Sequence, residues 1–305
     1  LLYDKRVYGE AVADYEKAAL KYPEFPTVHR NLALAYYNVK KQPQRAYEEM
    51  EKAFALDETD ARVYLELDQL KKRLNVPVKE RWSDMEKHFD LVESRDDLYL
   101  EYVTLLNTLG EPEKALGLIK ARKFHQWEGG EGKVAAQYLT ALYQLAKAAV
   151  EKEDYAEAKE LLLRAVGEYP HNLGEGKLES GQENNLYYLL GLVQEKLGEA
   201  KDAFESLTRA CCGESEPVGM MYYNDQPPEM IYYQGLAYRM LGEEEQAVRR
   251  FQKLVDYGRE HIRDDVKIDY FAVSLPDLLI FEENLNERNR KHCLFMMSLG
   301  LKGLG

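Results

Sequence analysis

Two segments of this chain carry the side chains whose types and spacing could do chemistry. Residues 125–133 read His-Gln-Trp-Glu-Gly-Gly-Glu-Gly-Lys, and residues 171–177 read His-Asn-Leu-Gly-Glu-Gly-Lys. Carboxylates placed across a sugar from one another are the equipment of a glycoside hydrolase. The Gly-Lys pairs could instead suggest a phosphate loop, but Val134 and Leu178 stand where that motif requires Ser or Thr. A nucleotide site is therefore excluded.

A third segment adds acidic and aromatic residues, so the candidates for a site on loops at one edge come from three places. They are His125, Trp127, Glu128, Glu131, Lys133, His171, Asn172, Glu175, Lys177, Asp269, Tyr270 and Asp277. Their spacing does not match a helical zinc-protease motif, and the three cysteines lack the spacing of a zinc site. We expect no metal and no cofactor. The alternative for these loops is purely structural: the glutamates cap helices and the lysines pair across stacked loops.

A repeat in the sequence predicts the elements that position these loops. A small residue is followed twelve positions later by Ala, then four later by a bulky apolar residue, and three later usually by Ala. Clear copies begin at Ala146, Gly191 and Gly235. Residues four and seven apart share one helix face, so each copy predicts a helical hairpin whose small residues allow close packing.

The repeat becomes longer partway along the chain. One step takes about 35 residues at first and about 44 later, with Arg81 standing at one of the Ala positions. The added residues must lie between hairpins, and the two Gly-Glu-Gly-Lys segments, one long step apart, should be neighbours. We therefore expect standard repeats over 1–124 with the first truncated, expanded repeats over 125–260, and a long loop with a capping helix over 261–305.

This pattern resembles the tetratricopeptide repeat, whose signature combines a Leu-Gly pair, an aromatic residue between two alanines, and a closing Pro. Leu190-Gly191 supplies the pair, Phe251 an aromatic residue and Pro170 a closing residue. The resemblance implies an all-α, right-handed α-solenoid of about seven helical hairpins that binds proteins without catalysis.

A narrower resemblance covers roughly residues 90 to 305. The two Gly-rich segments and the string Asp-Tyr-Phe-Ala-Val-Ser-Leu-Pro-Asp are similar to the repeat region of large uncharacterised bacterial tetratricopeptide proteins. In that group the region follows an N-terminal β-rich domain suspected of sugar recognition. This resemblance, together with a first residue that is Leu rather than Met, implies a fragment of a larger protein.

The inner face of the expected solenoid is a second candidate surface. In the tetratricopeptide family the residue three before the small first-helix position points inward, which implies Tyr143, Tyr188 and Tyr232 there, with Lys147 and Arg239 beside them. A ladder of tyrosines offers flat apolar area with a hydroxyl, which suits a peptide or a sugar chain. The alternative is that these rings only fill space between neighbouring helices.

The net charge and the mean hydropathy limit the kinds of partner that the chain could bind. The net charge is −13 and the mean hydropathy is −0.55, which argue against nucleic acid and against a membrane. We expect a non-catalytic cytoplasmic scaffold for a protein or peptide, with an upstream domain of the same polypeptide as one candidate partner. A carbohydrate-binding or glycoside-processing module on the loop edge is the alternative function. Apolar residues in 294–304 predict a helix that caps the array or joins two copies of the chain.

Overall fold

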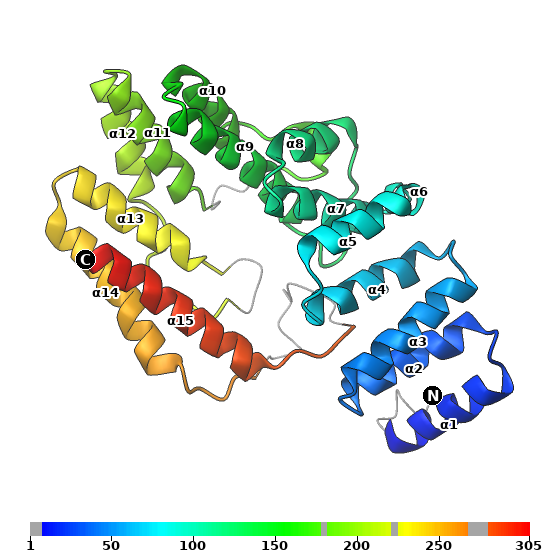
Figure 1. Ribbon diagram of the computed structural model, residues 1–305. Helices are drawn as coiled ribbons and strands as arrows, with labels where there is room; N and C mark the ends of the chain where they lie inside the picture. Colours follow the sequence, from blue (N-terminus) through cyan, green and yellow to red (C-terminus); the bar gives the residue numbers. More distant parts are fainter. Residues whose placement is uncertain (1–7, 178–181, 221–224, 268–279) are drawn as a thin grey trace. The chain divides into compact units, whose positions relative to one another are not determined.

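Helices supply all the regular structure in the described part of the chain. A computed structural model describes residues 8–177, 182–220, 225–267 and 280–305. Fifteen α-helices and one 3-10 turn, with no strand, account for the regular structure of these residues (Figure 1). The predicted all-α fold class is confirmed.

The helix bounds follow the expected order of hairpins. They are α1 Tyr8–Lys21, α2 Pro26–Asn38, α3 Pro43–Leu56, α4 Ala61–Arg73, α5 Val78–Lys87, α6 Phe89–Glu93, α7 Asp96–Thr108, α8 Pro112–Ala121, α9 Lys133–Glu151, α10 Tyr155–Val166, η1 His171–Leu173, α11 Asn184–Lys196, α12 Ala200–Ala210, α13 Pro228–Met240, α14 Glu244–His261 and α15 Leu285–Leu304.

The chain forms two compact units. Unit 1 comprises Leu1–Leu109 with Leu279–Glu283, and unit 2 comprises Gly110–Leu278 with Asn284–Gly305. Within unit 1, α1 packs on α2 and α2 on α3; within unit 2, α9 packs on α10, α11 on α12, and α13 on α14. The units are divided by packing, whereas the expected boundaries after residues 124 and 260 are defined by repeat length and stay predictions.

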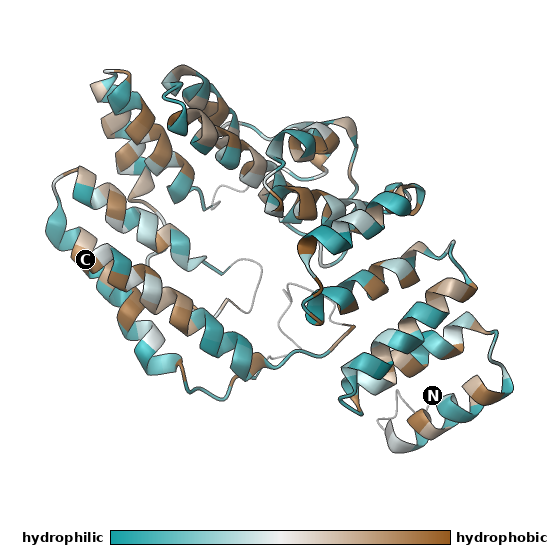
Figure 2. Ribbon diagram, in the orientation of Figure 1, coloured by the Kyte–Doolittle hydropathy of each residue, from teal (hydrophilic) through white to brown (hydrophobic). Residues whose placement is uncertain are grey.

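The two helices of a hairpin pack where the repeat places its small residues. A Cβ atom on Gly191 of α11 would lie 2.6 Å from Cγ of Leu207 on α12, and one on Gly235 of α13 would lie 2.4 Å from the ring of Phe251 on α14. Figure 2 shows hydrophobic and hydrophilic residues alternating around the helices, as expected of helices with one buried face. The predicted role of the repeat positions in close packing is confirmed.

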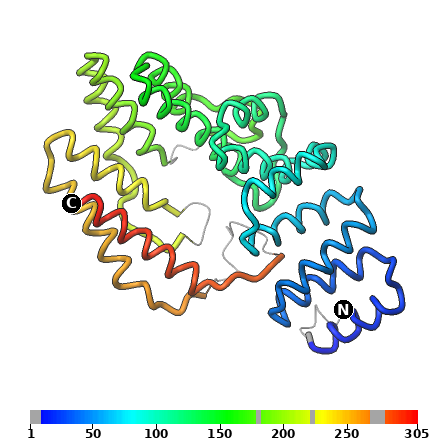
Figure 3. The backbone as a smooth tube through the Cα atoms, in the orientation of Figure 1, coloured from blue at the N-terminus to red at the C-terminus, as the bar shows by residue number. Residues whose placement is uncertain are grey.

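The extra residues of the longer repeats lie between hairpins, as predicted. Short turns join α9 to α10, α11 to α12, and α13 to α14, and longer connections join α10 to α11 and α12 to α13 (Figure 3). In the short turns Gly198 and Gly242 have φ values of 78° and 81°, a left-handed conformation that favours glycine. These glycines end one helix so that the next can return alongside it.

Helix α15 packs on α14 and α13 and so covers the last hairpin of unit 2. A Cβ atom on Gly300 would lie 2.5 Å from the backbone oxygen of Phe251, so the two helices approach closely there. The expected role of α15 as the cap of the array stays a prediction. Leu294, Phe295 and Leu301 are exposed on α15, and association of two copies through them stays a prediction. No helix among the described residues is both long and apolar enough to cross a bilayer.

Candidate functional site

Four tyrosines from three first helices form one cluster in unit 2, which we call the tyrosine cluster: Tyr143, Tyr188, Tyr232 and Tyr233. The hydroxyls of Tyr143 on α9 and Tyr233 on α13 lie 2.9 Å apart, within hydrogen-bonding distance. The Tyr233 ring centroid lies 5.6 Å from that of Tyr188 on α11 and 5.7 Å from that of Tyr232. The structure therefore brings together the three tyrosines selected from the sequence.

Tyr233 joins the other members of the cluster and was missed in the sequence. The repeat rule selects one position per first helix, and Tyr233 is the residue after that position. The adjacent pair Tyr232-Tyr233 is the feature of the sequence that could have indicated a role for Tyr233. Two adjacent rings on a helix cover a wider face than one ring does. Burial raises the pKa of Tyr143, and the Tyr233 hydroxyl adds to the rise, so this phenol stays protonated at neutral pH.

The two predicted cations of this face already have partners. The Lys147 ammonium lies 5.8 Å from the centroid of the Tyr143 ring. The Arg239 guanidinium makes a two-pronged contact with the carboxylate of Glu244, with nitrogen to oxygen distances of 2.9 and 2.7 Å. Both cations are exposed, so a ligand can reach them.

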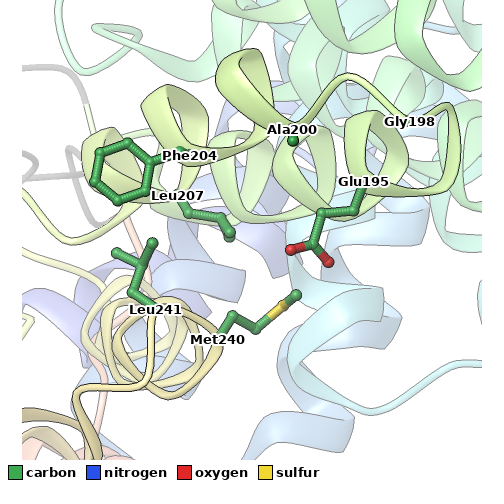
Figure 4. Close-up of a pocket in the computed structure, with 7 residues that line it drawn as sticks. All are labelled: Glu195, Gly198, Ala200, Phe204, Leu207, Met240 and Leu241. Atoms are coloured by element: carbon green, nitrogen blue, oxygen red, sulfur yellow. The ribbon is translucent and has the colours of Figure 1, made fainter.

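An open pocket with mostly apolar side chains, and with polar surface as well, lies at the C-terminal ends of α11 and α13, beside α12 (Figure 4). The volume of this pocket, which we call the apolar pocket after its side chains, is about 490 Å³. The residues that line it are Glu195, Gly198, Ala200, Phe204, Leu207, Met240 and Leu241. Glu195 is two helical turns after Tyr188, and Met240 is two turns after Tyr233. Residues seven apart share a helix face, so Tyr188 and Glu195 lie on one face of α11, and Tyr233 and Met240 lie on one face of α13.

Two features make this pocket suited to a ligand. The Phe204 side chain is 62 % exposed although it is a large aromatic group. Figure 4 shows the Glu195 carboxylate directed toward the side of the pocket where Met240 lies. Within the described residues Glu195 forms no ion pair, so this carboxylate can accept a cation from outside.

The loop segments form a second, smaller pocket, of about 300 Å³. Its lining includes five predicted candidates: His125, Trp127, Glu128, Glu131 and Glu175. The structure thus gathers these residues at one place, as the sequence suggested. Trp127 packs over Gly130, where an added Cβ would lie 2.2 Å from the indole ring.

Two loop candidates from the second segment make structural contacts. The Glu175 carboxylate accepts hydrogen bonds from the backbone N–H groups of Gly132 and Ala135, both at 2.8 Å, and so caps the start of α9. The Asn172 amide donates to the backbone oxygens of Ile119 and Arg122 at 2.7 and 2.9 Å. The Glu175 contacts also confirm that the two Gly-Glu-Gly-Lys segments are neighbours.

The remaining loop candidates lie apart from that cap. The Lys177 ammonium pairs with the Glu183 carboxylate at 2.7 Å, and Lys133 is the first residue of α9. His171 is exposed in η1 and is not among the residues lining the smaller pocket. Asp269, Tyr270 and Asp277 lie outside the described residues. Among the described residues, no cluster of three or more His, Cys, Asp or Glu side chains could hold a metal ion.

Comparison with solved structures gives matches at low sequence identity. The C-terminal part of a TPR repeat-containing protein from Cytophaga hutchinsonii is 14 % identical, with a TM-score of 0.45, covering 84 % of this chain and 92 % of that one. YrrB, a TPR protein with an unusual peptide-binding site, is 18 % identical, with a TM-score of 0.42, covering 64 % and 90 %. PilW, a type IV pilus biogenesis factor, is 12 % identical, with a TM-score of 0.40, covering 76 % and 92 %.

A sequence match locates repeats within unit 2. The model of the family described as tetratricopeptide repeat matches residues 140–172 and 229–257. The first match spans most of α9 and all of α10, and the second spans all but the first residue of α13 and most of α14. These are the helices that carry Tyr143, Tyr232, Tyr233 and Met240. Two segments of the chain are therefore similar to the tetratricopeptide repeat, whereas Tyr188 and the pocket residues of α11 and α12 lie outside both matches.

Proposed function

We propose that this chain is a non-catalytic scaffold that binds a peptide or a segment of another protein through the tyrosine cluster and the apolar pocket. The observation that carries the proposal is the apolar pocket, which has an exposed Phe204 at its edge and an unpaired Glu195 carboxylate in its lining. An open pocket of this kind takes an apolar side chain. The carboxylate favours a cation beside that side chain.

The tyrosine cluster supplies the rest of the expected contact area. Aromatic rings with hydroxyl groups contact peptides at low entropic cost, because each ring has few rotatable bonds. The cluster rings already pack on one another, so they would meet a ligand as a preformed surface. The expected ligand is therefore a segment that lies on the tyrosine cluster and places an apolar residue and a neighbouring Lys or Arg at the apolar pocket.

The test is selection of ligands from a random-peptide display library on the purified chain. Enriched peptides are then synthesised and their affinities measured for the chain and for the variant Phe204→Asp. Loss of one apolar contact removes about 1.5–3 kcal/mol, so we expect affinity to fall about tenfold or more. Glu195→Lys should weaken the peptides that carry a cation and spare those without one.

The matched control is Leu20→Asp, the same kind of change at an exposed apolar residue of α1 in unit 1. It should leave peptide affinity unchanged. Failure to enrich any peptide, or equal binding by F204D, would remove the proposal. Far-UV circular dichroism of each variant establishes that the helices are intact.

A second candidate function is sugar binding or glycoside processing at the smaller pocket. Trp127 and three carboxylates line this pocket, and an aromatic ring beside carboxylates suits a sugar. Because both Glu175 oxygens already accept backbone hydrogen bonds, Glu128 and Glu131 are the pair that would act. Turnover of a soluble glycan panel that is lost in Glu128→Gln and Glu131→Gln would support this function. Absence of both turnover and glycan binding would exclude it.

A further inference from the structure

A short segment far along the chain lies on unit 1. Residues 279–283 belong to unit 1 by packing, although the chain before and after them belongs to unit 2. Of these, Ile280 to Glu283 are described, and they contact the end of α2 and the turn after it. Residues 280–283 form no helix, so packing of one helix on another does not explain how they bind to unit 1.

One asparagine side chain holds the backbone of this segment at two points. The Asn38 amide nitrogen donates to the backbone oxygen of Ile280 at 2.8 Å, and the Asn38 amide oxygen accepts from the backbone N–H of Glu282 at 2.9 Å. These two groups belong to the peptide bonds on either side of Phe281. A single amide therefore recognises the main chain around one residue, whatever side chains precede and follow it.

The side chains of the segment add selectivity. Phe281 is only 1 % exposed, and its ring meets the Tyr37 ring edge-on, with centroids 5.0 Å apart. The Glu282 carboxylate pairs with the Lys41 ammonium at 2.6 Å. Tyr37, Asn38 and Lys41 thus contact the ring, the main chain and the acidic group of the same short peptide.

We propose that Tyr37, Asn38 and Lys41 form a peptide-recognition site for segments with Phe followed by an acidic residue, and that Ile280–Glu283 occupies this site as an internal ligand. A partner protein that presents the same short sequence binds by displacing it. The site lies in unit 1 and does not depend on the apolar pocket of unit 2.

The contacts that hold Ile280–Glu283 are weak enough for another peptide to replace this segment. Its ion pair is exposed on both sides, and exposed pairs contribute little. Its two amide hydrogen bonds are neutral, and an incoming peptide makes the same two bonds. The main advantage of the internal segment is that it is tethered, which gives it a high effective concentration.

The test measures binding of a fluorescent peptide with residues 280–284 between flanking glycines, by anisotropy, to the whole chain. Phe281→Ala weakens the internal ligand, so this variant should bind the peptide at least tenfold more tightly than the unaltered chain. Adding Asn38→Ala to it should reduce affinity about tenfold. A peptide with Ala in place of Phe should not bind.

Two further variants keep the test decisive. Phe281→Leu, which retains an apolar side chain, should show a smaller gain in the same direction. Adding Lys41→Glu to F281A should make the site prefer a peptide with Lys in place of the first Glu by a few-fold. The unit 2 variant F204D should bind the peptide as the unaltered chain does, which separates this site from the proposed function. Equal affinity of F281A and the unaltered chain, or no effect of Asn38→Ala, would overturn the proposal.

Discussion

The two units hold their helices together by different means. In unit 1, buried charges meet across helices: the Glu66 side chain on α4 is 0 % exposed and accepts two hydrogen bonds of 2.6 Å from Arg30 on α2. In unit 2, glycines meet rings and backbone: Gly235 faces the Phe251 ring and Gly300 faces the Phe251 backbone oxygen. Helices pack in pairs in both units, around buried ion pairs in one case and around glycines in the other.

One position shows the difference directly. Arg81 stands at the repeat position where other hairpins have a buried Ala, such as Ala158. The Arg81 side chain is only 4 % exposed and contacts the Asp68 carboxylate at 2.5 Å and the Glu101 carboxylate at 2.7 Å. A hairpin can therefore close around a paired charge as well as around a methyl group, but the charge makes it dependent on its partners.

The chain offers one fluorescent probe for each unit. It has two tryptophans, Trp82 in unit 1 and Trp127 in unit 2. The variant Trp127→Phe therefore reports unfolding of unit 1 through Trp82, and Trp82→Phe reports unfolding of unit 2 through Trp127. Urea unfolding followed in these two backgrounds measures the two units separately.

The largest effect is expected from Arg81→Met in the W127F background. It leaves the buried Asp68 carboxylate without its cation and Glu101 with Lys72 alone, which should lower the free energy of unfolding of unit 1 by about 3–5 kcal/mol. The control is Arg62→Ala, whose side chain is 62 % exposed in its pair with Glu66. This control should cost less than about 1 kcal/mol. Similar losses in the two variants would contradict the structural importance of the buried charges.

An intermediate effect is expected from Gly300→Ala in the W82F background. The new Cβ atom would lie 2.5 Å from the Phe251 backbone oxygen, so α15 must move away from α14. We expect the free energy of unfolding of unit 2 to fall by about 1–3 kcal/mol.

Gly117→Ala is the matched control for this change. Gly117 lies within α8, and an added Cβ there meets nothing within 4 Å. Ala is favoured over Gly in a helix by roughly 1 kcal/mol, so this variant should stabilise unit 2. If both substitutions changed the free energy of unfolding of unit 2 in the same direction, the close approach at Gly300 would not be what keeps α15 packed on α14.

The smallest effect is expected from acid. Burial alone would raise the pKa of Glu101, but the charges of Lys72 and Arg81 outweigh it and hold that pKa below its usual value. In the same way Lys71 lowers the pKa of Asp84 against the effect of burial. Burial raises the pKa of Asp68 despite Arg81, which partly offsets these two groups.

The lowered pKa values of Glu101 and Asp84 determine how the stability of unit 1 changes with pH. A carboxyl with a lowered folded pKa stabilises the fold above its ordinary pKa, and this stability is lost as pH falls through the folded pKa. Unit 1 should therefore lose stability between about pH 5 and about pH 3.

Unit 2 should respond differently to acid. Burial raises the pKa of Glu183, so protonation of this group does not cost stability. The carboxyls of unit 2 with lowered pKa values, Glu244, Asp265 and Glu287, are exposed and screened by solvent. Urea midpoints at the two pH values, measured in the W127F and W82F backgrounds, compare the units. A parallel fall in both would contradict this difference.

The sequence alone determined the helical hairpins and the location of their small residues. Helix periodicity is local, and a Gly or Ala that recurs at a fixed distance from a bulky residue has one main explanation, which is close packing of two helices. The same counting placed the extra residues between hairpins and made the two Gly-Glu-Gly-Lys segments neighbours. The resemblance to the tetratricopeptide repeat selected Tyr143, Tyr188 and Tyr232, which the structure brings together.

Only the tertiary structure decided which side chains meet across the repeats. Tyr233 contacts Tyr143 from two hairpins away, and Asn38 contacts a segment more than two hundred residues later in the chain. Arg81 could be recognised as an exception in the repeat, but not as the partner of Asp68 and Glu101. Repeat spacing reports how neighbouring helices pack. Contacts between residues distant in sequence depend on how the hairpins turn relative to one another, which no local pattern encodes.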